Sequence, residues 1–110
     1  MLDHDPTHKM RMIPSGRWAD FLKDLSHSQQ GKTIRIAQGE TTRQAILETL
    51  EYHHSLMGGH DVVITTEEAD TGQSITVDFN LIWAVFDQDD KLIAVELTDD
   101  QNRKTTLHLQ

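Results

Sequence analysis

The segment Leu81–Phe86 constrains the fold of this 110-residue chain most, because it is apolar on both faces of any strand it forms. Side chains alternate across a strand, so each face receives three of these six residues. One set is Leu81, Trp83 and Val85, and the other is Ile82, Ala84 and Phe86. A sheet with one solvent face usually shows polar residues there. Burying one Leu, Ile or Phe side chain is worth about 1.5–3 kcal/mol, so protein should cover both faces.

Three kinds of cover are compatible with this segment: a second helix, a sheet that curls into a barrel, or another copy of the chain. In the first two cases Leu81–Phe86 is an intramolecular core strand, and in the third it forms a dimer interface. The residues expected at such an interface are Ile82, Trp83, Ala84 and Phe86.

A helix is predicted before the first strand. Apolar residues recur at helical spacing, which indicates one buried stripe of an α-helix over residues 16–27. They are Trp18, Phe21, Leu22 and Leu25. Ser15 is placed to cap this helix at its start, and Gly31 supplies the left-handed residue that ends it. In residues 32–38, Ile34 and Ile36 alternate with polar residues, which predicts a short half-buried strand.

Residues 42–57 are predicted to form a second helix. Thr41 and Gln44 have the spacing of a capping box, and Gly58-Gly59 is typical of a helix stop. A strand would place Leu47 on the face of polar neighbours, whereas a helix gathers apolar residues on one face. That face carries Ile46, Leu50, His53 and Met57.

From His60 onward the pattern is β. Strands are predicted in four segments, separated by turns that include the Asp-rich residues 87–90 and 99–102. The segments are Val62–Thr66, Ser74–Asp78 with its apolar extension Phe79–Phe86 and a bend at Asn80, Leu92–Thr98 and Lys104–Leu109. Short separations favour antiparallel hairpins. The sequence therefore predicts an α+β fold, with an N-terminal helix packed on a mainly antiparallel sheet of about five strands. The alternative is a small β-barrel with an N-terminal helix. Residues 1–12 are expected to be a disordered leader and residues 13–110 a single domain.

The charge and composition exclude several partners. Eighteen acidic residues against ten Lys and Arg give a formal charge of −8, and the cations are scattered, which disfavours nucleic acid and anionic membranes. The absence of cysteine excludes disulfides and thiolate chemistry. No apolar segment is long enough to span a bilayer or serve as a signal peptide, so the expected location is the cytoplasm.

The candidate metal ligands are His53, His54, His60 and Asp61. In a helix the first two would point about 100° apart, so the favoured interpretation is solvated residues near a helix end. The alternative is a metal-binding protein or metal-dependent enzyme that uses these four residues. Ser–His–Asp and phosphate-loop motifs are missing, and most carboxylates fall in turns. We therefore assign no catalytic residue and no cofactor, and do not favour an enzyme.

Two stretches resemble a family of small uncharacterised bacterial proteins that is known as a domain of unknown function. The opening stretch is Ile13-Pro14-Ser15 followed by Trp18, Phe21, Ser26 and Gly31, then Ile34 and Ile36. It resembles the family's Trp-x-x-Phe helix, glycine and strand. The closing stretch, Leu92–Leu97 with an Asp-rich turn and Thr105–Leu107, is similar to the family's final hairpin. In the middle, the family pattern looks strand-like where this sequence favours a helix. The resemblance implies no catalytic residue, ligand or activity.

These observations together predict a small acidic binding or assembly module. We expect a homodimer whose apolar sheet face forms the contact, while acidic turns keep the assembly soluble. The residues point to no particular small-molecule ligand.

Overall fold

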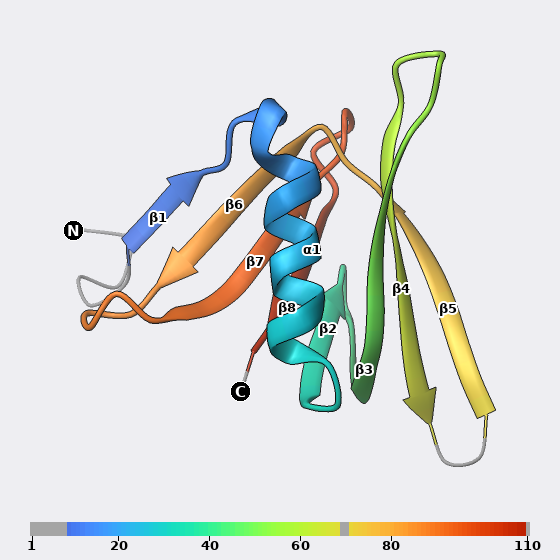
Figure 1. The fold of residues 1–110 in the computed structure, drawn as a ribbon, viewed down its shortest axis with the longest axis vertical. Coiled ribbons are helices and arrows are strands. Elements are labelled where there is room, and N and C mark those ends of the chain that lie inside the picture. Colours follow the sequence, from blue (N-terminus) through green and yellow to red (C-terminus); the bar gives the residue numbers. More distant parts are fainter. Residues whose placement is uncertain (1–8, 69–70, 110) are drawn as a thin grey trace.

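The structure, a computed structural model, describes residues 9–68 and 71–109. In this part of the chain one α-helix packs on one face of an eight-stranded sheet (Figure 1). The elements are β1 (Lys9–Met12), a 3-10 turn (Ser15–Arg17), α1 (Trp18–Gln29), β2 (Thr33–Gln38), β3 (Thr41–His54), β4 (His60–Glu68), β5 (Thr71–Asp78), β6 (Leu81–Phe86), β7 (Leu92–Thr98) and β8 (Lys104–His108). The predicted α+β class is confirmed, with more strands than expected.

The sheet is open and antiparallel. Its strand order is β1-β6-β7-β8-β2-β3-β4-β5, so β8 returns to pair with β2, and β1 and β5 are the two edges. The alternative of a closed barrel is therefore wrong. The predicted strands after His60 are confirmed, and the long strand predicted over residues 74–86 divides at Phe79 and Asn80 into β5 and β6.

The N-terminal helix is confirmed, with α1 shifted two residues from the predicted range of 16–27. Trp18, Leu22 and Leu25 are buried against the sheet. The indole Nε1 of Trp18 donates a hydrogen bond to the Ile13 carbonyl at 2.8 Å, which fixes the chain that enters the helix. Ser15 does not cap α1 with its side chain, because the 3-10 turn intervenes.

The predicted second helix over 42–57 is wrong, because these residues form β3 (Thr41–His54) and the hairpin turn that follows it. A β-bulge at Glu48 is the physical reason. Leu47 and the residue after Glu48 pair with consecutive residues of β4, so Glu48 is inserted as an extra residue. The bulge puts Leu47 and Leu50 on the same face of the sheet. Without the bulge these two residues would lie on opposite faces, and Leu47 would lie among polar residues, which is the pattern that favours a helix over a strand.

The hydrophobic core lies between α1 and the inner face of the sheet, which is the face that α1 covers. Both halves of the sheet contribute residues to one cluster. Its strand members are Ile34, Ile36, Leu47, Leu50, Val62, Ile64, Val77, Ile82, Val95, Leu97 and Leu107. Phe79 joins the cluster from the bend between β5 and β6. The strands that are distant in sequence are thus held by one layer of apolar contacts.

The N-terminal prediction needs a correction for part of its range. Residues 9–12, which the composition assigned to a disordered leader, form β1 and pair with β6. Tertiary pairing supplies the backbone hydrogen bonds that the polar sequence does not predict. Residues 1–8 lie outside the described residues.

The two Asp-rich turns share the same hydrogen-bonding pattern. The Oδ1 atoms of Asp87 and Asp99 each accept hydrogen bonds from the amides two and four residues further on, at 2.8–3.0 Å. Asp90 and Asn102 take the left-handed conformation, both with φ of 63°. The prediction that these carboxylates serve turn chemistry is confirmed. Within residues 9–68 and 71–109, no helix has the length and apolar character needed to cross a bilayer.

Candidate functional site

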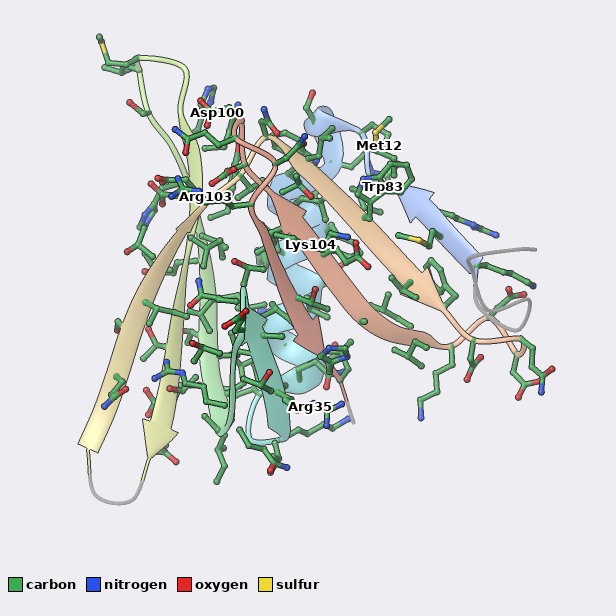
Figure 2. The ribbon with its side chains drawn as sticks, turned by 180° about the vertical axis from the view of Figure 1, so that it is seen from behind. Met12, Arg35, Trp83, Asp100, Arg103 and Lys104 are labelled. Carbon is green, nitrogen blue, oxygen red and sulfur yellow. The ribbon has the colours of Figure 1, made fainter. Side chains whose placement is uncertain are left out.

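The face of the sheet opposite α1, here called the outer face, carries an uncovered group of apolar side chains. Alternation along β6 directs Trp83 to this face, and Figure 2 shows it beside Met12 of β1. The register explains the proximity, because Met12 is directly opposite Trp83, and Met10 is directly opposite Val85. We define the apolar patch as Met10, Met12, Leu81 and Trp83.

The patch is accessible to a partner. Met10, Met12 and Leu81 are 49%, 52% and 37% exposed, and Trp83 is half-buried. Val85 is buried beside them. Scattered single apolar residues are normal on a protein surface, whereas contiguous ones mark interaction sites.

The patch borders a shallow hollow of about 390 Å³. Its lining residues are Met10, Leu81, Trp83, Glu96, Thr98, Asn102 and Lys104. At its rim the Lys104 ammonium and the Glu96 carboxylate form an ion pair at 3.1 Å. The lysine is exposed and the carboxylate is largely covered, so the rim presents its positive end to solvent.

The structure separates the four residues predicted at an interface. Ile82 and Ala84 are completely buried on the inner face, within one subunit. Phe86 is half-buried, and the Arg11 guanidinium lies 5.5 Å from its ring centroid. Only Trp83 is on the outer face. Ile82 belongs to the core cluster that includes Trp18, Leu22 and Leu25 of α1, so the inner side is covered within the same chain.

Sequence reasoning missed Met10 and Met12, although a signal was present. They alternate with Lys9 and Arg11, which is the period-two pattern of a strand with one apolar face. The pattern is too short to distinguish a strand from a leader unless its partner β6 is known.

Strand geometry divides the predicted metal cluster between the two faces. His53 is opposite Asp61 and His54 is opposite His60 in the β3–β4 pair. The His53 Nδ1 lies 3.2 Å from the Asp61 carboxylate on the outer face, while the other two rings stack at 4.4 Å between centroids on the inner face. No group of three or more ligand-type side chains converges among the residues that the structure describes.

His60 belongs instead to an aromatic group that joins the hairpin to α1. Its Nδ1 lies 2.7 Å from the Tyr52 hydroxyl, and its ring meets the Trp18 ring edge-on at 4.8 Å. Phe79 contacts Trp18 in the same manner at 5.0 Å. Burial raises the pKa of Tyr52, because the charged phenolate is poorly solvated there. This arrangement is structural.

A larger hollow of about 670 Å³ lies on the outer face between β5 and the β7–β8 turn. Both of its cations already have a carboxylate partner, because Arg103 pairs with Asp99 at 2.8 Å and Lys104 pairs with Glu96. Burial raises the pKa of Asp99, but hydrogen bonds from Arg103 and Gln101 and the Arg103 charge outweigh this effect and lower it. The charges in this hollow therefore stabilise the turn, and the apolar patch is the stronger candidate for a binding surface.

Comparisons with protein-family models, with curated proteins and with solved structures give no match.

Proposed function

We propose that this chain is a binding module that self-associates through the apolar patch. The observation that supports this function is the position of Trp83 on the outer face, among exposed Met10, Met12 and Leu81. Burial of such side chains contributes about 1.5–3 kcal/mol each, a large effect in a domain whose total stability is only about 5–15 kcal/mol.

The shape and side-chain composition of the surface favour a protein partner. The hollow is bordered by one side of an open sheet, so it suits a side chain that projects from another protein surface. Methionines adapt their shape to a partner, and an aromatic ring offers a rigid contact.

A second copy of the chain is the partner we favour. The same chain presents another exposed apolar element, the Leu56–Met57 tip of the β3–β4 hairpin. One chain therefore carries two exposed apolar surfaces, the patch and the tip, that could contact each other between two copies. The formal charge of −8 keeps such an assembly soluble but opposes association. Self-association should therefore strengthen as salt screens this repulsion.

Size-exclusion chromatography with light scattering tests the proposal. We expect a dimer at micromolar concentration for the natural chain, and a monomer for Trp83→Ser and for Met12→Ser. Ile46→Ser is the matched control, because Ile46 is 40% exposed on the outer face but lies outside the patch. The Met12 side chain is half exposed, so its variant should keep the fold, which circular dichroism can verify. A monomeric natural chain at these concentrations would overturn the proposed function.

A further inference from the structure

The β3–β4 hairpin ends in two adjacent apolar side chains that touch almost nothing. Leu56 and Met57 are 106% and 94% exposed, the highest values among the large apolar residues that the structure describes. In Figure 1 this hairpin extends beyond the rest of the sheet. Hairpin turns usually carry Asn, Asp or Gly. A Leu-Met pair at this position lowers the solubility of the protein and does not stabilise the turn.

The turn holds these side chains in a defined position. The Ser55 amide donates to the Gly59 carbonyl at 2.8 Å, and the Gly58 amide donates to the Ser55 carbonyl at 2.9 Å. The Ser55 hydroxyl accepts a hydrogen bond from the Met57 amide at 3.1 Å. Gly58 has φ of 93°, a conformation that side-chain-bearing residues rarely adopt. Because the backbone is already fixed, a partner would order little more than two side chains.

We propose that the Leu56–Met57 tip of a second copy occupies the hollow beside the apolar patch. This inference rests on the proposed function and names the segment that fills the site. The hollow has a volume of about 390 Å³, within the range of pockets that hold small organic molecules. Met10, Leu81 and Trp83 provide its apolar wall, which matches the chemistry of a Leu and a Met side chain.

The charges around the two elements are complementary. Below the tip, Glu51 and Asp61 lie on the outer face of the hairpin, with the His53 imidazole 3.9 Å and 3.2 Å from their carboxylates. At the rim of the hollow, the Lys104 ammonium is exposed and the Glu96 carboxylate that it contacts is largely covered. A hairpin that enters the hollow would bring its carboxylates towards this ammonium, which favours one orientation.

The positions of tip and hollow allow the contact to be reciprocal. In Figure 2, the end of the β3–β4 hairpin and Trp83 lie on opposite sides of the upper part of the molecule, so tip and hollow are separate surfaces of one subunit. A two-fold axis between two such subunits places each tip near the other subunit's hollow, which closes the assembly as a dimer.

Engineered cysteines test this contact directly, because the natural sequence contains no cysteine. Met57→Cys chains are mixed with Leu81→Cys chains that carry a mass tag, and mild oxidation is followed by mass spectrometry. We expect the mixed tip-to-hollow disulfide to exceed the product from Met57→Cys mixed with Ile46→Cys by at least tenfold. Equal yields, or a predominance of tip-to-tip disulfides, would overturn the inference.

A second measurement separates this inference from the proposed function. The double variant Leu56→Ser, Met57→Ser should weaken dimerisation about 100-fold, since two apolar side chains lose their burial. Both residues are fully exposed in the subunit, so the variant should unfold at the temperature of the natural monomer. If the natural chain dimerises and Trp83→Ser abolishes the dimer while the tip variant does not, the tip inference fails and the proposed function stands. If the natural chain is monomeric, both fail.

Discussion

The hydroxyl oxygen of Tyr52 lies 2.7 Å from Nδ1 of His60, across the β3–β4 pair. The hydrogen bond sits where the hairpin meets α1, because the His60 ring also contacts Trp18 edge-on. The base of the projecting hairpin is therefore anchored to the core, while its tip remains exposed.

The tyrosine in this pair should titrate at a higher pH in the folded chain than in the unfolded chain. Burial raises the pKa of Tyr52 above its ordinary value of 10.0. A raised pKa in the folded state stabilises the fold below the unfolded pKa, and this contribution is lost as the pH rises through the folded pKa. Since Tyr52 is the single tyrosine, tyrosinate absorbance measures it alone. Coincident titrations in buffer and in concentrated urea would contradict the prediction, and Tyr52→Phe provides the spectroscopic blank.

Ser26 should stabilise the bulged region of β3 through a hydrogen bond. Its hydroxyl accepts a hydrogen bond from the Leu50 amide at 2.9 Å, just after the bulge at Glu48. Ser26→Ala leaves that amide without its partner, so we expect a loss of about 1–3 kcal/mol in the free energy of unfolding. Ser28→Ala is the control, because its hydroxyl bonds only to the Leu25 carbonyl one turn earlier in the helix. Urea denaturation should show a smaller loss for the control, and equal losses would argue against this role for Ser26.

Acid should weaken the β7–β8 turn through Asp99. Although burial opposes its ionisation, the hydrogen bonds from Arg103 and Gln101 and the Arg103 charge lower the pKa of Asp99 below 3.8. A lowered pKa stabilises the fold above the unfolded value, and this contribution is lost as the pH falls through the folded value. Asp99→Asn should therefore lower the urea midpoint at neutral pH, with a smaller effect in strong acid. Asp100→Asn removes the neighbouring exposed charge as a control, and an Asp99→Asn effect that stays constant with pH would disprove the charge argument.

Zinc should not stabilise the fold through His53, His54, His60 and Asp61. The strand pairing directs His53 and Asp61 to the outer face and the two other histidines to the inner face, so one ion cannot collect all four. We expect no change in melting temperature when Zn²⁺ is added at a one-to-one ratio. Stoichiometric binding in calorimetry that disappears in both His53→Ala and His60→Ala would contradict this geometry.

Local patterns predicted several elements correctly. The spacing of Trp18, Leu22 and Leu25 identified α1, because a helix in a small domain must bury one stripe. The Asp-rich turns were predictable as well, since an Asp side chain bonds to its own following backbone wherever the turn lies.

The second helix failed for a reason that local pattern cannot reveal. The extra residue Glu48 changes which face the later residues of β3 occupy, and only pairing with β4 shows that it is extra. An uninterrupted strand would put Leu47 and Leu50 on opposite faces and leave Leu47 among polar residues, which is why the alternation favours a helix. The same limit affected the metal cluster, because residues close in sequence were divided between two faces.

For the long apolar strand, the amino-acid sequence alone established that both sides of Leu81–Phe86 are hydrophobic, a property that alternation makes readable. Which side the chain covers itself was decided only by the tertiary structure. Ile82 and Ala84 are buried on the side where Ile82 joins the core cluster that includes Trp18, Leu22 and Leu25 of α1, and Trp83 is left beside Met10 and Met12. The physical reason is that one helix can cover only one face of a sheet. Which face of β6 lies on that side depends on the strand order β1-β6-β7-β8-β2-β3-β4-β5, and this order arises from contacts between segments far apart in the chain.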